Sequence, residues 1–260
     1  MLFSIITICF NDLNGLSRTY NSLRYQFLED YEWVVIDGAS KDGTAKWLSQ
    51  LDEPKLNWSS EPDKGIFDAM NKGLVRSTGE YLIYMNSGDE FNGNDILQKI
   101  KDSISRCEKK PYYIYGDAID ITKENKSFLK LARDYTYNYK TMFTSHQAML
   151  FNREFGVKHN IIYPPQYKYT SDYAYISLYL KNIDDPTRIL KLDFPVCRFL
   201  LGGTNEIYRY KAIKEDYKIR TQIMEINKLS ALSLFLQHFI HTYLKQKFPK
   251  MTKQLRYKKT

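Results

Sequence analysis

The sequence predicts an α/β fold with a mostly parallel central sheet that is flanked by helices. Apolar runs rich in β-branched residues alternate with amphipathic helical segments through about residue 107. Three of these runs end in polar, acid-containing loops. Because strand–helix repeats give parallel strands whose carboxyl ends share one edge of the sheet, we expect the three loops to meet at one crevice.

The first two predicted strands share one sequence pattern. Residues 3–10 (FSIITICF) form an apolar run that is followed by Asn11 and Asp12, which is typical of a strand ending in a polar turn. Residues 31–37 (YEWVVID) repeat this pattern and lead into the turn sequence DGASKDGT at 37–44.

The most informative stretch covers residues 61–91. Apolar residues at helical spacing predict a helix over 64–77, and the run YLIYM at 81–85 suits a covered strand. The acidic loop NSGDE at 86–90 follows directly, where open α/β sheets place their ligands. Such a loop alone is more often a simple turn, and the two similar loops upstream are what favour a site.

The remaining elements follow from the same patterns. Strands are expected near 3–10, 31–37, 55–60, 80–86, 112–119, 146–151 and 188–200. Helices are expected near 13–27, 42–51, 64–77, 93–107, 170–182 and 206–248, the last of them broken near Ser230.

Composition places the chain among globular proteins. With 260 residues, 43% of them hydrophobic and 26% charged, it can bury the core of one large α/β domain. Cys9, Cys107 and Cys197 have neither CxxC nor Cys/His spacing, so we expect reduced thiols and a cytosolic protein. The apolar run at 3–10 is too short for a secretion signal.

The formal charge of +8 is concentrated near the C-terminus. The segment 232–244 predicts a helix with a broad apolar face, and seven basic residues without an acid follow in 245–260. A helix of this kind with a polybasic run suits the cytoplasmic surface of a membrane, although it is too polar to span one. Packing on the rest of the protein, with a solvated tail, is an equally good interpretation.

Seven segments together resemble family 2 glycosyltransferases, which have the GT-A nucleotide-sugar-binding fold. They are SIITICFN (4–11), VIDGASKDGT (35–44), EPDKGIFDAMNKG (61–73), GEYLIYMNSGDEF (79–91), SHQAMLF (145–151), TSDYAYI (170–176) and FPVCRFLLGGTN (194–205). Their combined order and spacing are specific, although each segment alone is not. Within the family, the chain most resembles the bacterial enzymes that build lipopolysaccharide O-antigen and capsule.

The resemblance implies a division of the chain. A GT-A domain would cover residues 1–205, with a donor half at about 1–107 and an acceptor half at about 108–205. A helical extension with a basic tail would follow over 206–260.

The resemblance also implies which loops hold the nucleotide-sugar donor. Asp37, at the end of a strand, would accept hydrogen bonds from the edge of the base, and its alternative role is that of a turn or helix-capping residue. Thr7 and Asn11 are weaker candidates for the same pocket. Ser87, in the acidic loop, is a further donor-binding candidate.

The helix at 64–77 departs from the pattern of the family. Many relatives carry an Ala-Arg-Asn sequence whose arginine can meet the diphosphate, whereas this chain has Met70 at that place. Lys64, at the start of the helix, is the substitute that we expect, helped by the helix N-terminus. Asp68 could face the donor sugar, or Asp63 and Asp68 could simply compensate the helix dipole.

Asp89 is the candidate metal ligand. Mg²⁺ or Mn²⁺ would stabilise negative charge on the leaving diphosphate, and both ions prefer oxygen ligands. Related enzymes usually carry two or three carboxylates in this loop, whereas here only Asp89 aligns, with Glu90 beside it. The protein therefore offers the metal few ligands.

Asp172 is the candidate catalytic base. In similar enzymes an acid at this place deprotonates the acceptor hydroxyl, which attacks the anomeric carbon opposite the leaving nucleotide and inverts its configuration. Because Asp172 begins a helical run, helix capping is its alternative role.

Four residues are candidates for the acceptor side of the cleft. His146 and Gln147 would line it, although a lone histidine is more often structural, and we favour that interpretation for His146. Gly202 and Gly203 could belong to a loop that closes over a substrate, with a plain turn as the alternative.

Together these features predict an inverting glycosyltransferase. It would move a hexose or N-acetylhexosamine from a nucleotide-diphosphate sugar, a UDP-sugar before a GDP-sugar, to a surface-polysaccharide or undecaprenyl-diphosphate-linked acceptor. We expect a cytoplasmic enzyme, peripheral on the inner membrane.

Three other functions compete with this prediction. The reduced acidic loop would suit a non-catalytic sugar-nucleotide-binding protein. A nucleic-acid-binding module is disfavoured, because the basic residues concentrate in the tail instead of interleaving with a recognition motif. A nicotinamide dehydrogenase would need a GxGxxG turn, which residues 10–16 lack.

Overall fold

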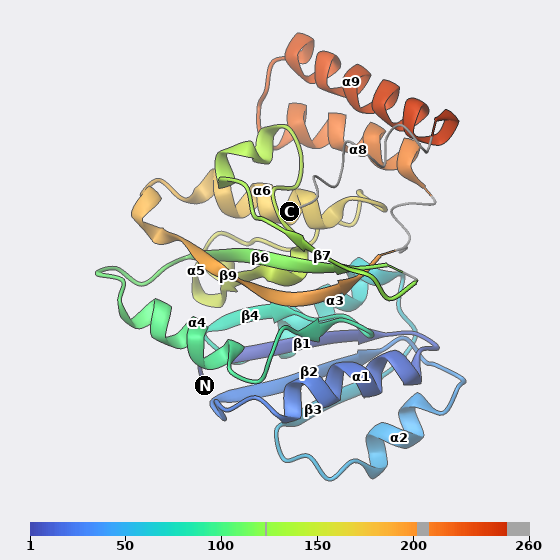
Figure 1. The fold of residues 1–260 in the computed structure, drawn as a ribbon, viewed down its shortest axis with the longest axis vertical. Coiled ribbons are helices and arrows are strands. Elements are labelled where there is room, and N and C mark those ends of the chain that lie inside the picture. The colour runs from blue at the N-terminus through green and yellow to red at the C-terminus, as the bar shows by residue number, and fades with distance from the viewer. Residues whose placement is uncertain (123, 202–207, 249–260) are drawn as a thin grey trace.

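The computed structural model describes residues 1–122, 124–201 and 208–248 (Figure 1). Its strands are β1 (Phe3–Cys9), β2 (Tyr31–Asp37), β3 (Leu56–Ser60), β4 (Tyr81–Tyr84), β5 (Glu90–Phe91), β6 (Tyr113–Ile121), β7 (Ser127–Lys130), β8 (Met149–Asn152) and β9 (Ile189–Leu200). Its α-helices are α1 (Leu13–Arg24), α2 (Thr44–Gln50), α3 (Ile66–Arg76), α4 (Ile96–Ser105), α5 (Arg153–Lys158), α6 (Ser171–Asn182), α8 (Arg209–Gln222) and α9 (Lys228–Lys247). Short 3₁₀ turns are η1 (Tyr135–Tyr139), η2 (His146–Ala148) and η3 (Pro186–Arg188).

One sheet joins all of these strands in the order β3-β2-β1-β4-β8-β6-β9-β5, with β7 paired to β6 beside this path. β1 is parallel to β2 and β4, and β2 is parallel to β3. β8 is antiparallel to both β4 and β6, and β9 is parallel to β6. Six strands therefore run in one direction, which confirms the predicted α/β fold and places the carboxyl ends of β1, β2 and β4 at one edge.

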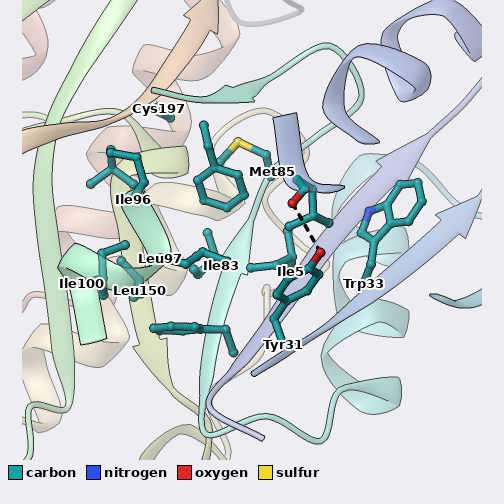
Figure 2. Close-up of a cluster of buried hydrophobic side chains, with 14 of the residues drawn as sticks. Ile5, Tyr31, Trp33, Ile83, Met85, Ile96, Leu97, Ile100, Leu150 and Cys197 are labelled. Carbon is teal, nitrogen blue, oxygen red and sulfur yellow. Dashed lines mark hydrogen bonds between the residues drawn. The ribbon is translucent and has the colours of Figure 1, made fainter. Parts of the chain in front are cut away.

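Helices cover both faces of the sheet, which is why β1 and β2 are buried at every position. On one face, Ile5 and Trp33 pack in a cluster with Leu97 of α4 (Figure 2). On the other face, Ile6 and its neighbours form a second cluster, which includes Tyr175 of α6. The alternation along each strand thus divides the apolar residues between two cores.

Several details differ from the sequence-based expectations. The short strands β5 and β7 and the helix α5 were not expected, because a few residues carry little periodic signal. The strand predicted at 146–151 was partly wrong, since residues 146–148 form the 3₁₀ turn η2. The predicted helix break near Ser230 is present and lies slightly earlier, at 223–227, where the Asn227 side chain caps α9 by accepting the Ser230 N–H at 2.9 Å.

The C-terminal helices stack outside α6, with α8 next to the body of the molecule and α9 beyond it (Figure 1). Ile219 of α8 shares a small apolar cluster with Tyr173 and Ala174 of α6. The domain boundary predicted at residue 205 lies outside the described residues. Within the ranges given above, no helix combines the length and the apolar character that crossing a bilayer requires.

Candidate functional site

Hydrogen bonds tie together the loops that follow β1, β2 and β4. The Asn11 N–H donates to the Ser40 hydroxyl at 2.7 Å, and the Lys41 N–H donates to the Asn11 side-chain oxygen at 2.8 Å. Ser87, after β4, donates to the Asp12 carboxylate, after β1, at 2.8 Å. The three loops therefore meet at one edge of the sheet, which brings the donor candidates Asn11 and Ser87 into one region.

Asp37 lies fully buried at the end of β2. The hydroxyls of Ser40 and Ser60 donate to its two carboxylate oxygens, the latter at 2.5 Å, and the Ser40 N–H adds a bond of 3.1 Å. Asp37 thus organises its own turn, which is the alternative role that the sequence left open. Recognition of a base by its remaining lone pairs stays a prediction.

The Thr7 side chain lies inside the core. It is fully buried, and its hydroxyl accepts the indole N–H of Trp33 at 2.9 Å. Because the side chain is fully buried, Thr7 is better placed to support β1 than to meet a ligand.

The start of α3 lies next to the loop that follows β2. Asp68, in the first turn of α3, accepts the backbone N–H of Lys64 at 3.0 Å, so its carboxylate binds the backbone just before the helix. The Lys64 side chain is exposed. A Cβ atom on Gly38 would lie 2.6 Å from the Asp63 carboxylate, so glycine at this position permits the two loops to approach closely.

Asp89 lies in the loop after β4 and is 5% exposed. Burial raises the pKa of Asp89 to about 8, although a hydrogen bond from Gln147 and backbone N–H donors oppose the increase. The carboxyl is therefore largely protonated at neutral pH as long as no cation is bound beside it. This contact brings the candidate metal ligand Asp89 together with Gln147, a candidate for the acceptor side of the cleft.

The loop around Asp89 offers few oxygen ligands to a cation. In the described part of the chain, no group of three or more His, Cys, Asp or Glu side chains is placed to hold a metal ion. The Asn86 side-chain oxygen in the same loop is buried and has no hydrogen-bond partner among the described residues. Asp89 and Asn86 fit Mg²⁺ or Mn²⁺ when phosphate oxygens and water complete the coordination shell.

His146 lies in an aromatic cluster, which supports the structural role that we favoured. Its Nε2 atom is 3.0 Å from the Tyr163 hydroxyl, and its ring packs against Tyr84 and Phe151. Burial lowers the pKa of His146 to about 3, so the imidazole is neutral. Gly202 and Gly203, the other acceptor-side candidates, lie outside the described residues.

Asp172 lies in the first turn of α6 and lines a cavity of about 110 Å³. Burial raises the pKa of Asp172 to about 6, the Tyr173 N–H opposes this, and the charges of Asp216 and Glu215 add to it. The carboxylate is thus ionised at neutral pH yet able to accept a proton. The other residues that line the cavity are Thr141, Met142, Thr170, Tyr173, Arg209 and Asp216.

Arg209 and Asp216 were missed by the sequence analysis. Both come from α8, which the sequence pattern presents as an extension remote from the chemistry. Burial raises the pKa of Asp216 to about 6, against the opposite effect of Arg220 and Arg209. The one available signal is the pair Glu215–Asp216, which are the two acids of an otherwise basic helix.

A series of contacts links Asp89 to Asp172. Gln147 bonds to Asp89, and its neighbour His146 contacts Tyr163. The Tyr163 ring stacks on Tyr175 of α6 with centroids 4.0 Å apart. The negative charge of Asp172 adds to the burial that raises the pKa of Tyr163. The loop that carries Asp89 is therefore connected to α6 through packed side chains.

A second cavity, of about 260 Å³, lies beside the loop that carries Asp89. Arg18 of α1 and Arg198 of β9 bring two guanidinium groups to this cavity. They place positive charge near the acidic loop. Met70 of α3, which stands where many relatives carry an arginine, is buried in the core and brings no charge there. The other lining residues are Gly88, Glu90, Ile121, Asn125 and Leu200.

Solved structures share this fold over most of the chain. TarS residues 1–349 from S. aureus, in complex with UDP-GlcNAc, superimposes with a TM-score of 0.69 at 15% identity, covering 99% of this chain and 76% of that chain. Mannosyltransferase PcManGT from Pyrobaculum calidifontis, in complex with GDP-Man and Mn²⁺, gives a TM-score of 0.64 at 15% identity, covering 90% and 69%. These likenesses show the GT-A fold.

Sequence relatives point the same way. An uncharacterized glycosyltransferase of Mycobacterium tuberculosis (strain ATCC 25618 / H37Rv) is 42% identical over 103 residues, which are 39% of each chain. A PGL/p-HBAD biosynthesis glycosyltransferase of Mycobacterium bovis is 30% identical over 122 residues, 45% of this chain and 47% of its own. The match thus spans less than half the length of these curated relatives. Residues 4–164 match the profile of glycosyl transferase family 2, and the chain therefore belongs to that family.

Proposed function

We propose that the chain is an inverting glycosyltransferase that moves a hexose or N-acetylhexosamine from a UDP-sugar to a hydroxyl of a surface polysaccharide or an undecaprenyl-diphosphate-linked acceptor. The observation that carries this proposal is Asp172, a partly buried carboxyl with a pKa of about 6 on the wall of a cavity. Transfer to a hydroxyl needs such a base near neutral pH. The TarS complex with UDP-GlcNAc supports a UDP-sugar as the donor.

The proposed reaction is a single displacement. The acceptor oxygen attacks the anomeric carbon while its proton passes to the Asp172 carboxylate. The bond from that carbon to the β-phosphate oxygen breaks, and its electron pair leaves with UDP. Asp89 and Asn86 would hold Mg²⁺ or Mn²⁺, which when bound neutralises charge on the diphosphate.

Donor binding tests the proposal directly. Isothermal titration calorimetry with a panel of UDP- and GDP-sugars, each with and without Mn²⁺, should find at least one UDP-sugar that binds. A protein that binds none of them would contradict the proposal. Donor binding without transfer to any hydroxyl would instead support the non-catalytic alternative.

The rate of transfer should depend on pH through Asp172. The base must be deprotonated to act, so kcat should be level above the Asp172 pKa of about 6. Below that pH, kcat should fall by about tenfold per pH unit as the carboxyl takes up its proton. Initial rates at saturating donor between pH 4.5 and 8 would measure this, with circular dichroism as the control for folding. A level kcat down to pH 4.5 would contradict the assignment.

We also propose that the protein works on the cytoplasmic face of the inner membrane. One side of α9 packs on α8 through Ala231 and Leu234, which accounts for the packing interpretation. The opposite side leaves apolar side chains exposed, and Lys245 and Lys247 follow in its last turn. A lipid-linked acceptor stays in the bilayer, so a surface of this kind would bring the enzyme to it. The exposed residues of this side are Leu229, Leu232, Leu236, Ile240, Tyr243 and Leu244, whereas the Phe239 ring packs on Tyr210 of α8.

Substitutions on this exposed side of α9 should reduce membrane binding. Replacing Leu232, Leu236 and Ile240 together by Gln should lower binding to anionic liposomes by more than about tenfold, because each buried apolar side chain contributes about 1.5 kcal/mol or more. Liposome sedimentation at low salt would measure this, and binding should weaken at high salt.

A matched control uses three exposed apolar residues elsewhere. Gln at Phe27, Val75 and Val157, which are at least 60% exposed, should leave liposome binding unchanged.

Truncation after Ser230 should abolish sedimentation with anionic liposomes while donor binding persists. If the unaltered chain ignores anionic liposomes at low salt, the membrane proposal is wrong.

A further inference from the structure

Glu215 of α8 binds the segment that leads into the candidate base. Its carboxylate accepts three successive backbone N–H groups, from Lys168 at 2.8 Å, Tyr169 at 2.8 Å and Thr170 at 3.0 Å. The Thr170 hydroxyl donates to the same carboxylate at 3.2 Å. α6 begins at the next residue, and Asp172 is its second residue. One side chain of the C-terminal extension therefore fixes the approach to Asp172.

These bonds hold the segment that precedes α6, a helix whose N-cap side chain does not cap it. Thr170 is the N-cap residue, yet its side chain makes no capping hydrogen bond with the helix. Charge-assisted hydrogen bonds that three consecutive N–H groups donate to a half-buried carboxylate hold a backbone more tightly than neutral bonds. The position of the first turn of α6 thus depends on Glu215.

α8 also holds the opposite wall of the cavity. Arg220 is fully buried and donates to the carbonyl oxygens of Tyr139 at 2.9 Å and Lys140 at 2.7 Å. The next two residues of the chain, Thr141 and Met142, line the cavity beside Asp172. Both walls of the cavity are therefore anchored to one helix.

We propose that Glu215 is a positioning residue for sugar transfer, which holds Asp172 in place against the acceptor through the backbone of residues 168–170. The helix α8 is then a working part of the catalytic centre and not an appendage. This inference rests on the proposed function, because it assigns Asp172 as the base.

The test compares two glutamate-to-glutamine substitutions. Glu215→Gln keeps the size of the side chain but loses the charge and one acceptor oxygen. Glu225→Gln is the matched control, because Glu225 also links the extension to α6, through an ion pair with Lys181 at 2.6 Å that is exposed to solvent. Glu215→Gln should lower kcat by about tenfold to a hundredfold with donor affinity unchanged, since small misplacements of a catalytic group have effects of that size. Glu225→Gln should leave both unchanged.

Two further measurements separate positioning from simple stability. Hydrogen exchange should become faster at the amides of residues 168–170 in Glu215→Gln and stay the same in Glu225→Gln. The ¹³C-detected titration of Asp172 should move to lower pH in Glu215→Gln, because a nearby negative charge is lost while Asp216, Arg209, Tyr163 and Tyr173 remain around it. Glu215→Asp, which keeps the charge, should recover part of the lost kcat.

The outcomes distinguish this inference from the proposed function. If the unaltered protein transfers sugar and Glu215→Gln keeps the parent kcat, the positioning role is wrong and the proposed function stands. If the unaltered protein transfers no sugar, the proposed function fails. The hydrogen-exchange experiment then still decides the link between Glu215 and the backbone, which unchanged exchange at residues 168–170 in Glu215→Gln would overturn.

Discussion

Asp172→Asn is expected to lower kcat by about two to four powers of ten, which is the usual contribution of a general base. Asparagine keeps the size of the side chain and can still occupy the first turn of α6, but it cannot accept the proton of the acceptor hydroxyl. Donor affinity should stay close to that of the parent, because Asp172 is assigned to the acceptor and not to the nucleotide. Steady-state transfer rates and donor calorimetry on the same preparations would measure both quantities.

The matched control for this substitution is Asp184→Asn. Asp184 is exposed just beyond the other end of α6, so the same chemical change there should leave kcat and folding unaltered. If Asp172→Asn transferred sugar at nearly the parent rate, Asp172 would not be the base. A loss of donor affinity equal to the loss of kcat would instead place Asp172 at the donor.

Asp89→Asn is expected to weaken Mn²⁺-dependent binding of the donor by about tenfold or more, the effect of losing roughly 1.4 kcal/mol of charge-assisted contact. Because burial keeps the metal-free carboxyl largely protonated, with a pKa of about 8, the amide should preserve its hydrogen bond to Gln147 and the fold. Thermal unfolding in EDTA should therefore change little, while calorimetry in Mn²⁺ should show the loss.

Glu90→Gln tests whether the effect belongs to Asp89 or to its neighbour. Glu90 follows Asp89 as the first residue of β5, and it lines the cavity with Arg18 and Arg198. We expect its substitution to preserve the dependence of donor binding on Mn²⁺. If Glu90→Gln loses that dependence and Asp89→Asn retains it, the metal ligand was assigned to the wrong acid.

The sequence was sufficient for the parts of the fold with a strong periodic signal. The runs at 3–10 and 31–37 became β1 and β2, because seven consecutive buried positions between two helical layers favour a mostly apolar run. It was insufficient where tertiary pairing creates an element, as in β5, whose two residues pair with Cys197 and Arg198 of β9. The two-residue strand has no pattern of its own to detect.

The candidate site shows the same division. The convergence of the loops carrying Asn11 and Ser87 follows from parallel strand order, so the sequence could predict it. The sequence could not show that the Asp37 carboxylate accepts a hydrogen bond from Ser60, because Ser60 lies on a different strand. The residues of α8 around Asp172 could not be predicted, because nothing in a helical pattern shows which part of the chain the helix packs against.

The configuration of the product tests the central claim most directly. UDP-hexoses carry the sugar in an α linkage, and a single displacement driven by Asp172 turns that linkage into a β linkage. We expect ¹H NMR of the first product formed from an α-linked UDP-sugar to show only the β anomer, and Asp172→Asn to form it about two to four powers of ten more slowly. An α-linked product, or a sugar bound covalently to the enzyme, would contradict single displacement with Asp172 as the base.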